Sequence, residues 1–206
     1  MKTKRKLNSI LKITFMVIAT FFIQSCSTDT VEESPEIEEI TETLAESIER
    51  IDPVEFNKAA NWRPAQPQHG KKYLIENYQG LYLGTSDDNF KNGINIKKVM
   101  LPGNYKESTW KMWDYGDRTI IKLASNDKYC VDVERYATGN GGNIHLWTYN
   151  AQGNQQFLFE RYRNENIFRI KNFNSKKYLA VSQHGNVIQW QFTDSRDQLW
   201  RLHKQN

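Results

Sequence analysis

The sequence has few of the residues from which metal sites and catalytic centres are built. It contains two cysteines and four scattered histidines, so no metal-ligand cluster is expected. It has no Gly-x-Ser-x-Gly elbow, no His-Glu-x-x-His pair, no phosphate-binding loop and no cysteine with a plausible histidine partner. A pair of carboxylates for glycosidic cleavage is an enzymatic alternative that the residues leave open. We therefore expect a non-enzymatic protein that uses no cofactor and no metal.

Long hydrophobic runs are also lacking, and the main apolar segment lies at the N-terminus. Residues 1–12 carry five basic residues and no acidic one, and residues 13–23 are almost entirely apolar. That run is shorter than the roughly 20 residues of a membrane-spanning helix. It ends at Ser25-Cys26, which resembles the lipobox of bacterial lipoproteins and implies cleavage after residue 25 and lipidation of Cys26. An ordinary secretory signal or a single-span anchor is the alternative, and either would also place the remainder outside the cytoplasm.

Residues 26–66 are expected to form an acidic tether. Residues 26–60 include 11 acidic side chains and two basic ones, and such a chain cannot bury enough apolar surface to offset its ordering entropy. Apolar residues at near-helical spacing predict one short amphipathic helix there: Ile37, Ile40, Leu44, Ile48 and Ile51. The heptads are too few for a coiled coil, so a tether helix is favoured over a helix that binds a partner.

Residues 67–206 show no long helical periodicity, which favours an all-β domain. Short strand-like segments are expected at residues 73–75, 81–83, 120–123, 168–170 and 178–181. Asn, Asp, Gly and Ser separate these segments at close intervals, as is typical of strands joined by turns. About 140 residues can form one hydrophobic core but not two.

An internal repeat divides this domain into three units. Residues 146–159 align without a gap with residues 189–202, and a comparable shift in the other direction brings Trp110 to the position of Phe157 and Trp200. The units cover about residues 71–117, 118–164 and 165–206. One such unit cannot bury its own apolar face, so the repeat predicts a closed, pseudo-symmetric fold in which the three aromatic residues share a core.

Two motifs recur in register within these units. Residues 130–133 read Cys-Val-Asp-Val, Gln155 begins a Gln-Gln-Phe triplet, and Gln198 begins Gln-Leu-Trp. The first unit retains only Trp110 of its motif, with Ser108 in place of glutamine. From about Lys71 to the C-terminus, the chain therefore resembles ricin B-type lectins and related carbohydrate-binding modules, which carry a Cys-Leu-Asp-Val strand and a Gln-x-Trp motif. The resemblance implies a β-trefoil that binds carbohydrate.

The central repeat has the residue types that a sugar site needs. A pyranose offers vicinal hydroxyls and an apolar C–H face, which suit a carboxylate, an aromatic plane and amides. The resemblance implies that Asp132 accepts hydroxyl hydrogen bonds, that Trp147 stacks on the ring and that Asn154 adds a donor. It also places His145 at the pocket edge and gives Gln155 the role of orienting the carboxylate. The alternatives are turn roles for Asp132 and Asn154, a barrel-capping role for Trp147 and no role for His145.

The flanking repeats favour few sites rather than three. The position of the central carboxylate is occupied by Gly84 in the first repeat and Ala180 in the third, and neither can accept a hydroxyl. The third repeat retains Trp190, Asp197 and Gln198. It could therefore form a weaker second site if the aspartate takes the acceptor role, whereas the first repeat is expected to be scaffold.

The second cysteine departs from the family pattern. Family members commonly pair the cysteine of the Cys-Leu-Asp-Val strand with another that lies two residues beyond the site aromatic, and that position here is Tyr149. With Cys26 lipidated, Cys130 has no partner in the chain. We expect Cys130 to be a small buried residue.

Three functional hypotheses follow. The first is a lipid-anchored, exported glycan-binding protein of the cell envelope, on the periplasmic or the outer face, with neighbouring envelope proteins as further partners. The second is a protein-interaction β-trefoil, such as an inhibitor or assembly subunit, that uses its loops. The third is electrostatic binding of acidic polymers. The chain after residue 60 has 21 lysines and arginines against 13 acidic residues, and this net positive charge attracts such polymers. Nucleic acid is not expected, because no helix or aromatic ladder suits bases, and acidic polysaccharide is the favoured polyanion.

Overall fold

A computed structural model describes residues 61–100 and 108–206 of the chain. This part consists of strands joined by turns, loops and short 3-10 helices. The strands are β1 (Trp62–Ala65), β2 (Lys72–Asn77), β3 (Leu81–Thr85), β4 (Ile94–Val99), β5 (Thr109–Tyr115), β6 (Arg118–Leu123), β7 (Tyr129–Val133), β8 (Gly142–Thr148), β9 (Phe157–Tyr162), β10 (Phe168–Asn172), β11 (Tyr178–Val181), β12 (Val187–Trp190) and β13 (Trp200–Lys204). Three short 3-10 helices are η4 (Glu134–Tyr136), η5 (Gly153–Gln155) and η6 (Arg196–Gln198). The predicted all-β class is confirmed, and all five predicted strand segments lie within β2, β3, β6, β10 and β11. The expected signal peptide, Cys26 and the tether helix lie outside the described residues.

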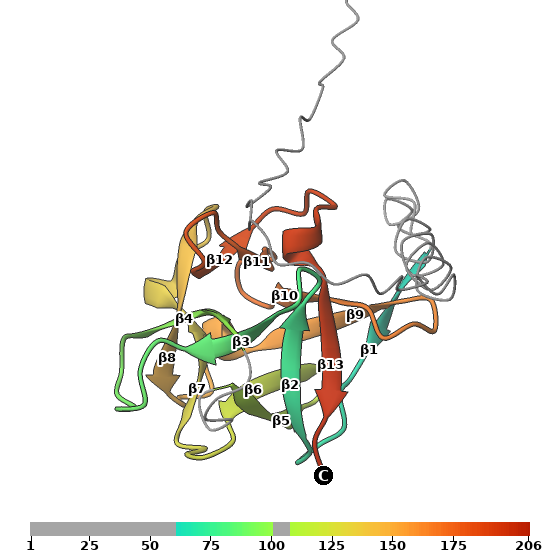
Figure 1. The fold of residues 1–206 in the computed structure, drawn as a ribbon. Helices are drawn as coiled ribbons and strands as arrows, with labels where there is room; N and C mark the ends of the chain where they lie inside the picture. Colours follow the sequence, from blue (N-terminus) through green and yellow to red (C-terminus); the bar gives the residue numbers. More distant parts are fainter. Residues whose placement is uncertain (1–60, 101–107) are drawn as a thin grey trace, which may run out of the picture. The chain divides into compact units, whose positions relative to one another are not determined.

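Six strands close into a barrel. Antiparallel pairing runs from β2 to β5, β6, β9, β10 and β13, and β13 pairs again with β2. Each repeat supplies two barrel strands and one hairpin, and the hairpins are β3–β4, β7–β8 and β11–β12. Further pairing of β8 with β4 and β12 joins the hairpins to one another (Figure 1). This arrangement is a β-trefoil, as the resemblance to ricin B-type lectins implies, and it is closed and threefold, as the repeat predicts.

The three repeated aromatic residues meet in one core. Trp110, Phe157 and Trp200 are almost completely buried and belong to a single hydrophobic cluster. The two indoles also bond to the hairpins, because Trp110 Nε1 donates to Leu83 O at 2.8 Å and Trp200 Nε1 donates to Leu179 O at 3.2 Å. Phe157 has no such donor. The prediction that these aromatic residues share a core is confirmed.

The first strand, β1, was not predicted from the sequence. It precedes the expected start of the domain at residue 67 and pairs with β9 along its whole length. Trp62 packs edge-on against Tyr162, with 5.3 Å between ring centroids. These two residues form a second, smaller hydrophobic cluster with Ile167 and Leu199. The last residues before the trefoil are therefore attached to the barrel. Within residues 61–100 and 108–206, no helix is long and apolar enough to cross a membrane.

Candidate functional site

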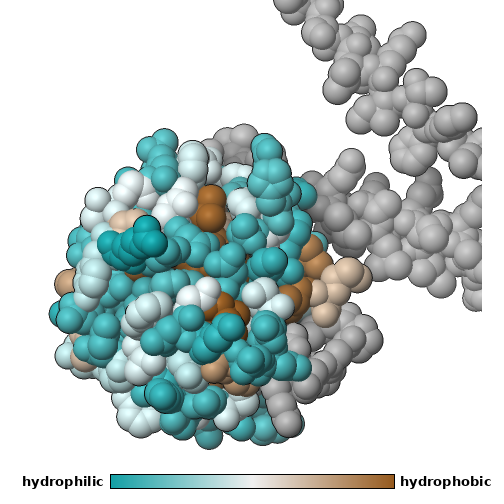
Figure 2. Space-filling view, turned by 90° about the vertical axis from the view of Figure 1, so that its left-hand side faces the viewer, coloured by the Kyte–Doolittle hydropathy of each residue, from teal (hydrophilic) through white to brown (hydrophobic). Residues whose placement is uncertain are grey.

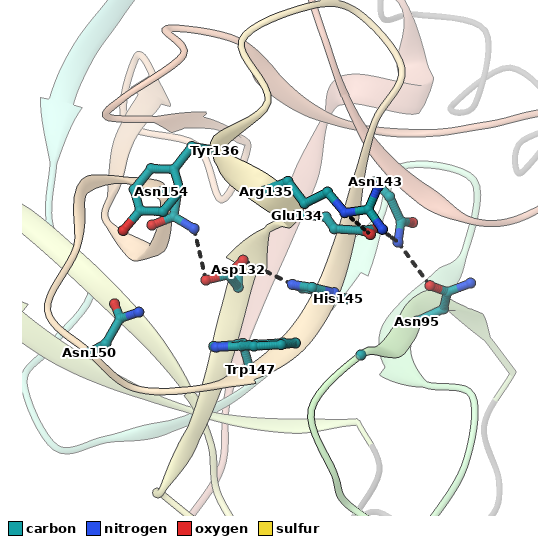
Figure 3. Close-up of a pocket in the computed structure, with 11 residues that line it drawn as sticks. Asn95, Asp132, Glu134, Arg135, Tyr136, Asn143, His145, Trp147, Asn150 and Asn154 are labelled. Atoms are coloured by element: carbon teal, nitrogen blue, oxygen red, sulfur yellow. Dashed lines mark hydrogen bonds and ion pairs between the residues drawn. The ribbon is translucent and has the colours of Figure 1, made fainter.

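A hollow of about 360 Å³ lies at the hairpin of the central repeat. Its walls come from β7, η4, β8 and the turn around η5, and β4 of the first repeat adds one side (Figure 3). The lining residues are Gly93, Asn95, Asp132, Glu134, Arg135, Tyr136, Asn143, His145, Trp147, Asn150 and Asn154. Four of the five residues that the sequence predicts for the central site therefore line one hollow, and the fifth, Gln155, lies directly behind it in contact with Asp132.

Asp132 is held at the floor of this hollow by a hydrogen-bond network. Its side chain is only 4% exposed. His145 Nε2 lies 2.9 Å from Asp132 Oδ1, while Asn154 Nδ2 and Gln155 Nε2 each donate to Oδ2 at 2.9 Å. A carboxylate offers about four acceptor positions. The network occupies three of them, so one position on Oδ1 remains for a ligand hydroxyl.

Asn154 and Gln155 contribute in different ways. The Asn154 amide also donates to Val133 O at 3.1 Å, but its Oδ1 is buried and has no hydrogen-bond partner in the described part of the chain. Gln155 bridges backbone groups of the same turn, because its Nε2 also donates to Thr148 O and its Oε1 accepts from Asn150 N. Gln155 thus orients the carboxylate, and the Asn154 amide supports it with N–H groups that Asp132 Oδ2 and Val133 O both use.

Trp147 forms an aromatic wall. It is 37% exposed and belongs to neither hydrophobic cluster, which argues against the alternative that it only caps the barrel. The His145 ring lies nearly parallel to the indole, with 5.1 Å between centroids and 16° between planes. The carboxylate of Asp132 faces this pair of rings in Figure 3. A polar acceptor and an apolar plane therefore border the same space, as a pyranose requires.

The other side of the hollow contains residues that the sequence did not single out. Arg135 and Tyr136 in η4 both have positive φ angles, of 52° and 55°. This backbone conformation is uncommon outside glycine, and such strain is concentrated at functional sites. The Tyr136 hydroxyl bonds to Gln152 Oε1, and Tyr136 lies across the hollow from Trp147 in Figure 3. The only sequence signal was an aromatic residue shortly after the Cys-Val-Asp-Val strand.

Asparagines from two repeats close the remaining side. Asn143 Nδ2 donates at 2.9 Å both to Asn95 Oδ1 and to Glu134 Oε2. Asn95 lies in β4, so this wall depends on contact between the first and the central repeat. The rim of the site thus has neutral amides and an ion pair, because Arg135 Nε lies 3.4 Å from Glu134 Oε1.

The family follows from a direct match. The family model described as "Ricin-type beta-trefoil lectin domain" matches residues 72–200 of the chain. This chain belongs to that family. The matched residues span all three repeats and contain the whole hollow, so the resemblance drawn from the sequence is confirmed.

Solved structures share the ricin-type fold. A designed threefold-symmetric protein, ThreeFoil, is 23% identical with a TM-score of 0.59, and the match covers 64% of this chain and 96% of that one. The Macrolepiota procera ricin B-like lectin, solved with lactose, is 20% identical with a TM-score of 0.55, covering 68% and 100%. An exo-β-1,3-galactanase from Clostridium thermocellum is 20% identical with a TM-score of 0.60, covering 68% of this chain and 31% of that one. These likenesses show the fold alone. No curated protein matches the chain.

The third repeat of the ricin-type domain has a poorer version of the site. Trp190 is 38% exposed and lines a second hollow with Asp197 and Ala180. Gln198 does not line that hollow. Its amide donates to Gln191 O at 2.7 Å and its oxygen accepts from Thr193, as Gln155 does within its own turn. With Ala180 in place of the central carboxylate, Gln198 has no acid to orient.

In the first repeat of the ricin-type domain, the aromatic wall and the carboxylate are both missing. Val99 lies opposite Tyr82 as Trp147 lies opposite Cys130, so Val99 occupies the position of Trp147, and Gly84 occupies the position of Asp132. No group at these two positions can accept a hydroxyl. Among the described residues, no cluster of His, Cys, Asp and Glu could hold a metal ion.

Cys130 is free and fully buried on β7. Burial raises the pKa of its thiol, and the nearby charge of Asp132 adds to the increase. A thiol needs to ionise before it can react as a nucleophile. Cys130 therefore has no reactive role in the folded domain.

We expect Cys130 to be unreactive toward a disulfide reagent until the domain unfolds. A Cys26→Ser form of the full chain leaves Cys130 as its sole thiol. Reaction with Ellman's reagent at pH 8 should be undetectable over minutes in the native protein and complete in guanidinium chloride. Rapid native labelling would contradict the burial of this side chain.

Proposed function

We propose that this protein binds carbohydrate without changing it chemically, through the hollow of the central repeat. The observation that carries the proposal is the meeting of an exposed indole with the Asp132 carboxylate, whose Oδ1 has one hydrogen-bond partner, His145, among the described residues. Trp147 would stack on the apolar face of a sugar ring while this oxygen accepts a hydroxyl hydrogen bond. Membership of the ricin-type lectin family supports this assignment.

The surface around the hollow favours a polar ligand. Figure 2 shows the side of the domain on which β4, β7 and β8 lie, and this face is mainly hydrophilic with small, separate hydrophobic patches. Stable protein interfaces usually have a larger apolar centre. The polar character supports a hydroxyl-rich ligand over the alternative of a protein-interaction trefoil.

We also propose that the protein is exported and lipid-anchored through Cys26. The N-terminal pattern of basic residues, a short apolar run and Ser25-Cys26 supports this assignment. One shallow hollow gives weak affinity for a monosaccharide, and several anchored copies on one membrane would raise the avidity for a polymer without new contacts. In this reading, the protein retains glycan or polysaccharide at the cell envelope, beside neighbouring envelope proteins.

The proposal is tested by glycan-array binding of the full-length chain and a Trp147→Ala variant. Loss of the indole should weaken retention of the bound glycan at least about tenfold, or about 1.4 kcal/mol. Val99→Ala is the matched control, because Val99 occupies the same place in the first repeat. It should leave binding unchanged.

Two results would count against the proposal. One is an array on which the wild-type chain retains no glycan. The other is glycan retention that Trp147→Ala leaves unchanged. A stable protein partner whose capture is insensitive to Trp147→Ala would instead favour the protein-interaction alternative.

A further inference from the structure

Three lysines lie directly opposite one another on neighbouring strands near the hollow. Lys72 on β2 is the partner of Lys111 on β5, and Lys111 is the partner of Lys122 on β6. Directly opposed residues project from the same face of a sheet, and like charges in such positions destabilise the pairing. The stability of the barrel therefore does not explain this lysine row, Lys72–Lys111–Lys122.

The equivalent positions in the other repeats carry no such repulsion. The counterpart of the Lys111–Lys122 pair is Arg201–Glu76 on β13 and β2, which forms an ion pair at 3.9 Å. The other counterpart is Leu158–Lys171 on β9 and β10. The like-charged pair thus occurs at one of three pseudo-equivalent places, and that place borders the central repeat.

The lysine row continues into the wall of the hollow. Lys122 is the β-sheet partner of Cys130 on β7, and Cys130 is the partner of Trp147 on β8. Neighbouring strands are about 4.8 Å apart, so the backbones of Lys122 and Trp147 are separated by roughly 10 Å on the same face. A polysaccharide with one residue against Trp147 can therefore bring an adjacent residue to the Lys122 ammonium.

Aromatic rings hold the central ammonium in place. Lys122 Nζ lies 4.9 Å from the centroid of the Trp113 ring and 4.4 Å from that of Tyr149. Cation–π contacts of this kind restrict a lysine without neutralising it. Lys122 makes no ion pair with a carboxylate in the described part of the chain, whereas Lys111 is 3.6 Å from Asp127. The row therefore retains excess positive charge at a fixed position.

We propose that the lysine row is an anion-binding subsite and that the ligand of this protein is an acidic polysaccharide, bearing carboxylate or sulfate groups. The inference rests on the proposed function, because it assumes a sugar in the central hollow. The ammonium groups pair with the anionic substituents of residues next to the one that stacks on Trp147. After residue 60 the chain has 21 basic and 13 acidic residues, and this net positive charge attracts such polymers at longer range.

Nucleic acid fits this surface less well. Proteins that bind single strands stack bases on open aromatic faces. Here Lys122 lies over both Trp113 and Tyr149, and Lys111 also lies 5.4 Å from the Trp113 ring. The rings position ammonium groups and do not form a platform for bases.

The experiment compares charged polymers with their neutral counterparts. The full-length chain in detergent is applied to immobilised polygalacturonate and its methyl ester, and to dextran sulfate and dextran. We expect at least about fivefold greater retention of the charged member of each pair at low salt, decreasing as salt screens the charges. A preference in only one pair identifies the anionic group as carboxylate or sulfate.

Two variants test whether the lysine row causes the preference for charged polymer. Lys111→Gln/Lys122→Gln should abolish most of the preference for charged polymer and reduce the slope of log K against log salt by up to about two. Lys171→Gln is the matched control, since Lys171 holds the position of Lys122 in the third repeat. It should retain the preference. Thermal melting should show that the double variant is as stable as the wild type, because it removes a repulsive pair.

Several outcomes would overturn the inference. Equal retention of charged and neutral polymers, including no retention of either, would do so. So would a charge preference that the double variant preserves, or single-stranded DNA bound as tightly as the acidic polysaccharides with the same dependence on the lysines. A failure of this inference alone would leave glycan-array binding sensitive to Trp147→Ala. A failure of the proposed function would make array binding insensitive to that substitution.

Discussion

Trp110→Ala is expected to lower the free energy of unfolding by about 3–5 kcal/mol, which is typical of a large aromatic residue removed from a core. Trp110 is completely buried and lies in the main hydrophobic cluster with Phe157 and Trp200. The substitution leaves a cavity where the three repeats meet, and it removes the hydrogen bond from the indole to Leu83 O. A loss of this size is a large part of the stability of a domain of this length.

The measurement is equilibrium unfolding in guanidinium chloride, with the midpoint and slope fitted separately. Trp110→Phe is the matched variant, because the central repeat already has Phe157 at the same position. It retains most of the aromatic volume but leaves the Leu83 carbonyl unbonded, so we expect a smaller loss of about 1–3 kcal/mol. A loss below about 1 kcal/mol for Trp110→Ala would show that this residue does not hold the barrel together.

The core and the closed threefold arrangement were predictable because the sequence repeats. The aromatic residues at 110, 157 and 200 recur in register, and a residue repeated in three units occupies equivalent places in a pseudo-symmetric fold. The family resemblance, and not the repeat, singled out Asp132, His145, Trp147 and Asn154, and these four residues line one hollow. Each of these residues lies on the β7–β8 hairpin or the turn that follows, so local pairing alone positions them.

The rest of the site was not predictable, for physical reasons that differ from residue to residue. Asn95 reaches the hollow because β4 of one repeat pairs with β8 of the next, a contact that no single repeat specifies. Tyr136 is placed by positive φ angles in a turn that contains no glycine, so the usual sequence signal for that conformation is missing. The strand β1 lies outside the repeat altogether, and its pairing with β9 leaves no periodic pattern.

In the third repeat, alignment with the central repeat wrongly suggests a supporting glutamine for a sugar site. Gln198 aligns with Gln155, and the two glutamines make the same contacts within their own turns. Only Gln155 also bonds to a carboxylate, because the third repeat has Ala180 at that position. The supporting glutamine is therefore retained for the turn itself, and its presence does not indicate a working site.

Asp132→Ala is expected to remove detectable carbohydrate binding while the domain stays folded. A hydrogen bond to a charged acceptor contributes about 1.5–3 kcal/mol, so each ligand hydroxyl lost from Asp132 weakens binding about tenfold to a hundredfold. The substitution also removes one of the two hydrogen bonds of the Asn154 amide, which loosens that wall of the hollow. Binding should fall below detection for a shallow site whose starting affinity is weak.

The cost of Asp132→Ala to stability is limited by the bonds that remain. Asn154 Nδ2 retains Val133 O, and Gln155 Nε2 retains Thr148 O. His145 Nε2 loses its only partner and one N–H of each amide is left unpaired, so we expect a loss of about 1–3 kcal/mol in the free energy of unfolding. The third repeat already folds with alanine at the equivalent position, Ala180, which is buried in strand β11.

Titration of the bound glycan by calorimetry, together with unfolding of the same samples, separates the two effects of Asp132→Ala. Asp132→Asn is the stricter variant, because it preserves volume but replaces one acceptor oxygen with a donor that faces the amides of Asn154 and Gln155 or the ring of His145. It should therefore bind as poorly as the alanine variant, although its side chain is nearly the same shape. Glycan affinity that survives in Asp132→Asn would mean that the carboxylate serves the hairpin alone, and the sugar would then have to be recognised elsewhere on the trefoil.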